Sequence, residues 1–344
     1  MIISNMQLIT RTHSSTTTPS RRARRLAQRS TLLACTVAAL AAPGVASAAD
    51  TVVAPDPAAH QVSALDGTVV WVSGAYGDQV LMQRTPAGVI ARVKDAPRAG
   101  YGSIDLGRDR KGKLVLTYAR CGKNDCTAKR DDLDGKRASF KNLTPKRCRL
   151  NGAPAVWGTR LAYGLYCRTP KKRADVKRSG LYVKNGSGSP RRLRLPSDVS
   201  KYFATGIGAV DLRGTRVAAI AWLDSSAYAF TETVNGNGMR SLNVAASEGD
   251  SERTATGVSL GKSNAMWTLS TSEYPGEPNR ANIRKVSRTC YRSESLVNPS
   301  GPNQEQGFPA TDLAVDHTTL YLVVPGTGIV KHDFAPQQGW CTKP

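Results

Sequence analysis

One segment of the chain has the residue order of a catalytic serine. Gly257-Val258-Ser259-Leu260-Gly261 matches the G-x-S-x-G pattern of a nucleophile elbow. That motif needs a strand, a sharp turn and a helix, and a histidine and an acidic residue that the fold brings to the serine. Here Ser259 lies in a segment that repeats along the chain, and Gly261 aligns with turn glycines of the other copies. We interpret the match as a coincidence within a structural repeat and assign no residue a catalytic role.

A second segment has acidic residues spaced as in a calcium loop. Asp131-Asp132-Leu133-Asp134-Gly135 places carboxylates at alternate positions, but it lacks the distal glutamate of the EF-hand pattern. Asp-Gly between two strands is an ordinary hairpin turn. Zinc is disfavoured because the chain has no C-x-x-C pair and only His60, His317 and His332 lie beyond residue 49. We expect no metal and no other cofactor.

Six of the seven cysteines lie beyond residue 49, and an even number in an exported chain favours disulfides. Neighbours along the chain are the expected partners: Cys121 with Cys126, Cys148 with Cys167, and Cys290 with Cys341. The first pair flanks the turn Gly-Lys-Asn-Asp, which would place the two residues opposite each other on a hairpin. The second pair brackets one strand-turn-strand unit. The third would tie the C-terminal tail to the preceding repeat.

Positive charge is concentrated in residues 136–194, which contain 17 lysines and arginines and one acidic residue, Asp175. Without the six arginines before residue 50, the chain has 42 basic and 26 acidic side chains, a net charge of +16, so this segment accounts for the whole excess. Such a patch attracts polyanions, or alternatively only keeps the protein soluble. The candidate binding residues are Arg168, Lys171, Lys172, Arg173, Lys177, Arg178, Arg191, Arg192 and Arg194.

Residues 1–49 have the parts of a secretory signal peptide. They contain six arginines and no acidic residue, an apolar run from Leu32 to about Ala42, and the small-residue end Ala46-Ser47-Ala48-Ala49. The apolar run is shorter than the roughly 20 residues of a membrane-spanning helix. We expect cleavage after Ala48 or Ala49, leaving residues 50–344 as a single secreted and soluble domain without a transmembrane segment.

The export route is left open by two partial motifs. Leu32-Leu33-Ala34-Cys35 resembles a lipobox, but most of the apolar run follows Cys35, which disfavours a lipid anchor. Ser20-Arg21-Arg22 resembles the start of a twin-arginine signal but lacks the usual apolar pair after it. The general secretory pathway is favoured over the twin-arginine route.

The elements that position these residues belong to a strand-turn-strand unit that recurs six times. The clearest copy is 211–242, which begins Asp211-Leu-Arg-Gly-Thr-Arg-Val-Ala. Five copies have a turn glycine, at positions separated by 45, 46, 56 and 47 residues: Gly67, Gly112, Gly158, Gly214 and Gly261. A glycine in such a turn supplies positive φ. A period of roughly 40–50 residues with four short strands per copy is typical of propeller blades.

The last copy is one strand short, and the strand-like run Asp50-Thr-Val-Val-Ala54 precedes the first copy. These two irregularities cancel if the N-terminal strand completes the last blade, which leaves no exposed sheet edge there. The predicted fold is therefore all-β, a six-bladed β-propeller whose last blade is closed by the N-terminal strand of the mature chain.

The repeat around Asp211-Leu-Arg-Gly-Thr-Arg-Val-Ala resembles that of the six-bladed TolB-like propeller superfamily, over most of residues 50–344. The Ser-Pro-Asp-Gly turn typical of those repeats is absent from every copy. The resemblance implies a fold but no function, because propellers serve as binding modules and as enzymes. We predict a secreted, non-enzymatic module, monomeric, that binds a protein or an anionic cell-envelope polymer and no specific nucleic acid. The alternative is an extracellular carbohydrate-active hydrolase or lyase with its site at the mouth of the propeller channel.

Overall fold

The computed structural model describes eleven stretches of the chain: 50–122, 126–140, 143–145, 147–167, 178–196, 206–222, 226–246, 252–273, 280–286, 291–296 and 310–332. All of them fall within one compact unit, Ala46–Pro344. They form β-strands and a single short 3₁₀ segment, η1 (Lys262–Asn264), which confirms the all-β class. Within these stretches, no helix has the length and apolarity needed to cross a bilayer.

Four of the sheets contain four antiparallel strands each. The first consists of β2 (Ala59–Leu65), β3 (Thr68–Ser73), β4 (Val80–Arg84) and β5 (Ile90–Arg92). The next two consist of β15 (Gly206–Arg213), β16 (Arg216–Trp222), β17 (Ser226–Thr233) and β18 (Arg240–Ala246), and of β19 (Glu252–Leu260), β20 (Met266–Glu273), β21 (Arg280–Val286) and β22 (Tyr291–Leu296). The last has the order β1 (Thr51–Pro55), β25 (Gly328–His332), β24 (Thr319–Val324) and β23 (Asp312–Asp316).

A fifth sheet has nine strands. One half consists of β6 (Gly100–Arg108), β7 (Leu114–Cys121), β8 (Cys126–Asp131) and β9 (Arg137–Ser139). The other half consists of β10 (Cys148–Leu150), β11 (Ala155–Trp157), β12 (Arg160–Cys167), β13 (Gly180–Asn185) and β14 (Arg191–Arg192). In this half, β10 and β11 both pair with β12, so together they act as one inner strand with a break between them.

A single parallel pairing joins the two halves, between Trp157 of β11 and Arg108 of β6. The backbone N–H of Gly158 donates to the Arg108 carbonyl at 2.8 Å. A Cβ at Gly107 would lie 1.9 Å from the Val156 carbonyl oxygen, so the strands approach this closely only because residue 107 has no side chain. For this reason the structure contains five sheets, not six separate ones.

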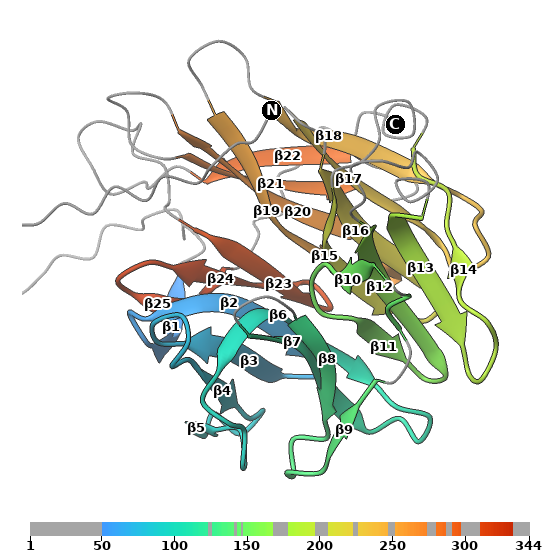
Figure 1. Ribbon diagram of the computed structural model, residues 1–344. Coiled ribbons are helices and arrows are strands. Elements are labelled where there is room, and N and C mark those ends of the chain that lie inside the picture. Colours follow the sequence, from blue (N-terminus) through green and yellow to red (C-terminus); the bar gives the residue numbers. More distant parts are fainter. Residues whose placement is uncertain are drawn as a thin grey trace, which may run out of the picture. The chain divides into compact units, whose positions relative to one another are not determined.

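The N-terminal strand completes the last sheet, as the count of strands in the repeats predicted. β1 pairs antiparallel with β25, from Thr51 opposite Lys331 to Pro55 opposite Gly328. Ala54 of β1 is buried, and the Asp50 carboxylate lies 2.6 Å from Nδ1 of His332. Figure 1 shows the blue β1 beside the red β25, with the first sheet next to the last.

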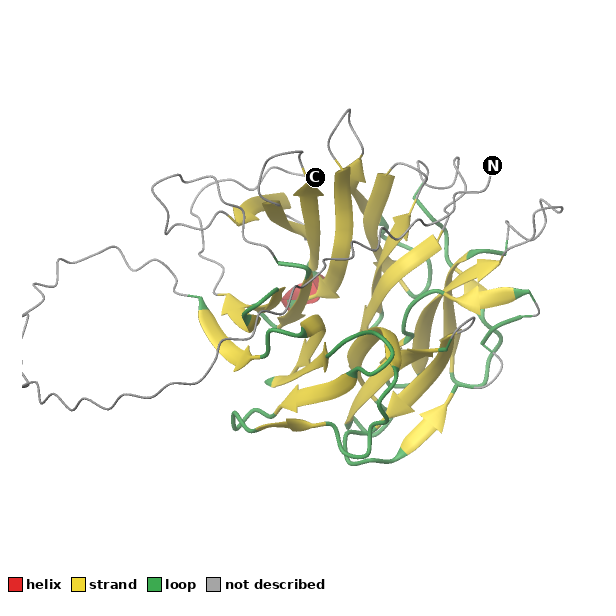
Figure 2. Ribbon diagram, turned by 60° about the vertical axis from the view of Figure 1, so that its left-hand side comes forward, coloured by secondary structure: helices red, strands yellow, loops and turns green. Residues whose placement is uncertain are grey.

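The sheets have a propeller-like arrangement. The innermost strands contact one another in succession, from β2 to β6, β11, β15, β19 and β23, and β23 contacts β2 again. Apolar side chains fill the spaces between the faces of adjacent sheets, which is where the core lies. Figure 2 shows the twisted strands of the sheets standing side by side. Alternating apolar residues on each strand produce this packing because successive side chains point to opposite faces.

The turns of the repeat follow the predicted backbone in four copies and differ in the fifth. Gly67, Gly112, Gly158 and Gly214 all have positive φ. Gly261 does not: its φ is −94°, and the turn after it is η1. A Cβ on Gly261 would lie 2.8 Å from Nε1 of Trp267 and 2.9 Å from the His317 carbonyl, so glycine is needed there for close packing and not for a turn.

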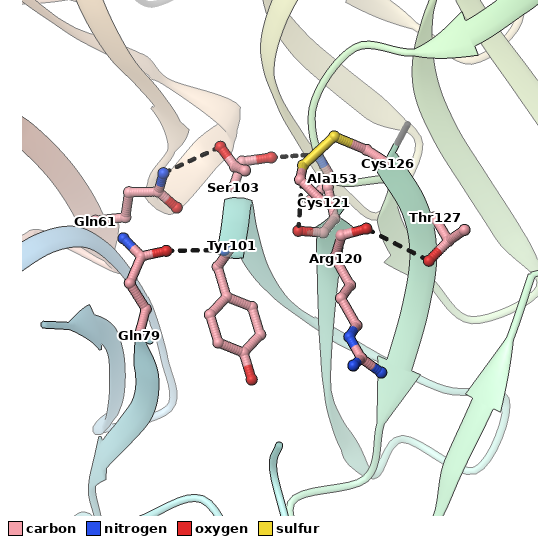
Figure 3. The surroundings of a disulfide bond; sticks show 11 residues. Gln61, Gln79, Tyr101, Ser103, Arg120, Cys121, Cys126, Thr127 and Ala153 are labelled. Atoms are coloured by element: carbon pink, nitrogen blue, oxygen red, sulfur yellow. Dashed lines mark hydrogen bonds between the residues drawn. A yellow bond between two sulfur atoms is a disulfide. The ribbon is translucent and has the colours of Figure 1, made fainter. Parts of the chain in front are cut away.

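Two of the three expected disulfides are present. Cys121 is bonded to Cys126, and the two residues are opposite each other in β7 and β8. Cys148 is bonded to Cys167 across β10 and β12. Cys290 and Cys341 lie outside the described residues. Figure 3 shows the first bridge beside the hydrogen bonds that link β6 to its neighbours.

Candidate functional site

The predicted basic patch is described only at its C-terminal end. Arg191 and Arg192 form β14, the edge strand of its sheet, and both side chains are exposed, as is that of Arg194. Arg178 precedes β13, and its carbonyl accepts a hydrogen bond from the Tyr182 hydroxyl at 2.7 Å. The other predicted residues are Arg168, Lys171, Lys172, Arg173 and Lys177, and they lie outside the described residues.

The structure adds two arginines from the next sheet to this patch. Arg191 donates through Nη2 to the Val234 carbonyl, and Arg216 of β16 donates through Nη1 to the Gly238 carbonyl at 3.0 Å. Both side chains therefore contact the turn between β17 and β18. Burial lowers the pKa of the Arg216 guanidinium, and the positive charge of Arg240 in β18 lowers it further. We call Arg191, Arg192, Arg194, Arg216 and Arg240 the arginine surface.

A buried glutamate lies among these arginines. Glu232 of β17 is fully buried, and neither of its carboxylate oxygens has a hydrogen-bond partner. Burial raises its pKa to about 7, although the positive charges of Arg191, Arg194 and Arg216 act in the opposite direction. Sequence reasoning did not identify Arg216, Arg240 or Glu232 because their proximity to β14 depends on the packing of two sheets.

A second candidate site is a central cavity of about 410 Å³. The inner segments of all the sheets line it, through His60–Ser63, Gly102–Asp105, Asn151–Ala153, Gly208–Asp211, Thr256, Val258, Ser259 and Thr311–Ala314, together with Ile220 and Trp222. The volume falls within the range of roughly 300–1,000 Å³ that is usual for small-molecule sites. Apart from Ser259, which was assigned no function, sequence reasoning placed none of these residues in a site, because each segment contributes only a few of them.

Asp105 and Asp211 lie in the wall of the cavity and are nearly completely buried, with 6% and 4% of their surface exposed. Asp211 accepts hydrogen bonds through Oδ2 from the backbone N–H of Leu260 at 2.6 Å and from the Ser259 hydroxyl at 3.1 Å. Burial raises the pKa of Asp105 well above its usual range, and the negative charge of Asp211 adds to this shift.

Arg213 links three inner strands beside these acids. Its Nη2 donates to the carbonyls of Ala64 at 2.9 Å and Val315 at 2.6 Å, and its Nε lies 3.8 Å from Oδ2 of Asp211. The side chain is 12% exposed. Arg213 therefore balances the charge of Asp211 and joins three sheets beside it.

A third acid, Asp312, also lines the cavity. Its Oδ2 accepts from the backbone N–H of Val62 at 3.0 Å, and its Oδ1 accepts from that of Leu313 at 2.9 Å. Burial raises the pKa of Asp312 to about 7, against the effect of these two hydrogen bonds. The nearby Gln61 donates through Nε2 to the Gly102 carbonyl at 3.0 Å, as Figure 3 shows.

The two motifs that resembled catalytic or metal sites have structural roles. Ser259 lies in β19, and its hydroxyl also accepts from the backbone N–H of Val315 at 3.1 Å, so it joins neighbouring inner strands. In the Asp131–Asp134 turn, the acids pair with basic side chains: Asp131 with Arg137, and Asp132 and Asp134 with Lys113. This hairpin turn leads from β8 to β9, as predicted.

Among the described residues, one other group of side chains has the spacing of metal ligands. Asp66, Asp316 and His317 place their ligand atoms within 4.8 Å of one another. Both Asp316 oxygens already accept backbone hydrogen bonds, from Asp66 and Gly67, and Asp66 pairs with Arg108. These bonds account for the group as a link between the first and last sheets.

Comparison with known proteins supports the fold alone. No family model matches the sequence, and neither does any curated protein sequence. The PQQ-bound aldose sugar dehydrogenase of Streptomyces coelicolor is similar over 83% of this chain and 99% of that chain, with 13% identity and a TM-score of 0.50. The chain is a propeller-like all-β protein. At 13% identity, this similarity does not extend to activity.

Two other solved structures are similar at lower scores. Virginiamycin B lyase from Staphylococcus aureus has 12% identity and a TM-score of 0.45, covering 83% of this chain and 98% of that one. The Aleuria aurantia lectin in complex with α-methyl-L-fucoside has 10% identity and a TM-score of 0.47, covering 82% of this chain and 93% of the lectin. Neither similarity is close enough to carry an argument about this protein.

Proposed function

We propose that the chain is exported, loses residues 1–49 and folds as a monomeric six-bladed propeller related to the TolB-like superfamily. The support for six blades is the core packing within the nine-stranded sheet. Val115 and Ala128 of one half pack against Val156, Leu161 and Leu165 of the other, in an apolar cluster like those between the separate sheets. Two halves that bury apolar faces against each other behave as two blades, which Trp157 and Arg108 join at one edge.

We further propose that the protein is a non-enzymatic binding module for an anionic cell-envelope polymer. The observation that carries this proposal is the arginine surface, to which two sheets contribute, and Arg191, Arg194 and Arg216 lie close enough to Glu232 for their charges to act on its carboxyl group. Three of these side chains are exposed, those of Arg191 and Arg192 on the edge strand β14 and that of Arg194 shortly after it. Arginine presents a planar fork of donors that matches phosphate and carboxylate groups. Repeated anionic groups along a polymer would engage several of them at once.

Salt-dependent binding tests this proposal. The probes are polyphosphate and poly-L-glutamate, titrated against the mature chain at 50 and 300 mM NaCl. We expect an affinity that falls at least about tenfold over this range, because contacts with a charged polymer release counterions. Charge reversal at three positions, R191E, R192E and R194E together, should abolish most of the binding.

The matched control is a second triple variant with the same change in net charge. It replaces exposed or partly exposed basic residues of other sheets and turns: R84E, K94E and K111E. If the two triple variants lost equal affinity for the polymers, binding would depend on net charge alone, which would contradict the proposal. Binding of both probes that does not weaken with salt would also contradict it. The polymer version would be overturned if the mature chain bound neither polymer but captured a protein partner, and if the R191E substitution abolished that capture.

The hydrolase or lyase alternative is favoured by a different observation. Asp105, Asp211 and Asp312 line one cavity, together with His60, so the acids that such an enzyme needs are present there. Glycoside cleavage uses two carboxyl groups in different protonation states. Incubation with soluble polysaccharides, followed by measurement of new reducing ends or unsaturated products, tests this alternative. Products that persist in the D312N variant would exclude Asp312 from the reaction.

A further inference from the structure

The central cavity contains an unusual number of hydrogen-bond acceptors without partners. Four buried side-chain oxygens in its wall have none within the described residues: Gln61 Oε1, Thr256 Oγ1, Asp105 Oδ2 and Asp211 Oδ1. Buried polar atoms normally find a partner, because leaving one unpaired costs roughly 1–3 kcal/mol. Asp105 and Asp211 are more than nine-tenths buried, so bulk solvent does not reach them freely. The cavity is therefore suited to a molecule that donates several hydrogen bonds.

The charge of the cavity points to a neutral molecule. Burial raises the pKa of Asp105 well above its usual range and that of Asp312 to about 7, so both carboxyls favour the neutral form more than an exposed aspartate does, and Asp312 is mostly protonated below neutral pH. Arg213 offsets the charge of Asp211. A protonated carboxyl donates one hydrogen bond and accepts others, which matches a hydroxyl group in both directions.

The remaining wall includes an aromatic surface. The partly buried Trp222 lines the cavity, and a Cβ at Gly208 would lie 2.7 Å from its Nε1, so the indole lies against the backbone only because residue 208 is glycine. Val62, Val258 and Leu313 add apolar side chains. A wall with one aromatic ring, a few apolar groups and several precisely placed polar atoms is typical of a small-molecule site.

We propose that the central cavity binds a neutral, hydroxyl-rich ligand, a sugar residue, through Gln61, Thr256 and Asp312, with Trp222 against its apolar face. This site is independent of the arginine surface, since none of the arginines of that surface lines the cavity. It requires no bond cleavage, and it differs from the polymer proposal in selecting an uncharged ligand. The cavity volume of about 410 Å³ falls in the range of small-molecule sites.

The probes that test this proposal are the methyl glycosides of glucose, galactose, mannose and fucose, with N-acetylglucosamine. Glucuronate serves as the anionic comparison, and glucosamine and spermidine as the cationic ones. Binding to the mature chain is measured by saturation-transfer NMR and calorimetry at 300 mM NaCl. We expect at least one neutral sugar to bind saturably, and more tightly than its charged counterparts.

Variants assign this binding to the cavity. T256V should weaken the binding of the sugar at least about tenfold, because it removes the hydroxyl with little change of volume. T318V is the matched control, at an exposed threonine that does not line the cavity, and it should leave the affinity unchanged. If T256V does not fold, as judged by its thermal unfolding, W222F and Q61L replace it. The R191E, R192E and R194E triple variant should retain sugar binding, which separates failure here from failure of the polymer proposal.

Three outcomes would overturn the assignment. The first is no saturable binding of any neutral sugar. The second is an affinity that T256V, W222F and Q61L all leave unchanged, which would place the sugar elsewhere. The third is tighter binding of glucuronate, glucosamine or spermidine than of every neutral sugar, which would make the cavity a site for a charged ligand.

Discussion

The Asp211 carboxylate accepts a hydrogen bond from the backbone N–H of Leu260 at 2.6 Å, although the two residues are 49 positions apart. This bond joins the inner strands of two consecutive sheets. Similar bonds join other neighbours: Leu106 N–H donates to the Ser63 hydroxyl, and Val315 N–H donates to that of Ser259. Short polar side chains on the inner strands therefore hold successive sheets in register around the cavity.

The D211N variant should be destabilised by about 3 kcal/mol in urea unfolding. The substitution removes the negative charge beside Arg213, which is only 12% exposed, and leaves a largely buried cation without the carboxylate that offsets its charge. D134N is the control, because Asp134 is 71% exposed and pairs with Lys113 on the surface. Its stability should change by less than about 0.5 kcal/mol. Similar effects of the two substitutions would refute a special role for the Asp211 pair.

Glu232 should make stability fall as the pH rises. Its folded-state pKa of about 7 exceeds the ordinary value of 4.5, so the stability linked to its proton is fully present below about pH 4.5. Between these two values the unfolded chain loses the proton while the folded chain keeps it, and the loss is complete above about pH 7. The shift corresponds to at most about 3 kcal/mol.

Measurement of unfolding free energy from pH 4.5 to 8 checks this effect. The stability of E232Q relative to the unsubstituted chain should increase over this range by about 2 kcal/mol, because an amide does not titrate. D78N is the control, at a carboxylate that is 70% exposed in a surface pair with Arg98, and its relative stability should stay constant. A constant difference for E232Q as well would contradict the raised pKa.

The two disulfides should contribute unequally to stability. Cys121 and Cys126 are separated by 5 positions, and Cys148 and Cys167 by 19. Closing the longer loop restricts the unfolded chain more, so removing it (C148S with C167S) should cost about 3 kcal/mol, against about 2 kcal/mol for C121S with C126S. Non-reducing peptide mapping of the mature chain should also find Cys290 joined to Cys341. Any other partner for either cysteine would refute the predicted third bridge.

Deletion of Asp50–Pro55 should lower stability by more than about 3 kcal/mol and promote association. The deletion removes the buried Ala54 and the contact between Asp50 and His332, and it exposes the edge of β25. Differential scanning calorimetry and light scattering measure the two effects. V52A is the control, because Val52 is 49% exposed in the same strand, and its effect should be small. A truncated chain with unchanged melting temperature would show that β1 does not close the sheet.

Local features of the sequence were sufficient to predict the strands. The turn predicted at Gly214 joins β15 to β16, and the strand-like run predicted at 50–54 forms most of β1. Turn glycines and period-two alternation act over a few residues, so they are visible in the chain itself. The same holds for the pairing of Cys121 with Cys126 and of Cys148 with Cys167, each within one unit of the repeat.

The candidate sites depend on contacts between residues far apart in the chain. Asp105, Asp211 and Asp312 lie in separate repeats, where each looks like an ordinary strand residue, and only the arrangement of the sheets brings them to one cavity. Arg216 and Glu232 lie near Arg191 because two sheets pack together. The backbone of Val156 lies close to Gly107, and no local pattern of the sequence indicates this contact. The sequence by itself determined the strands, turns and local disulfides, because these follow from neighbouring residues. The tertiary structure decided which side chains share an environment, because burial and charge depend on every sheet at once.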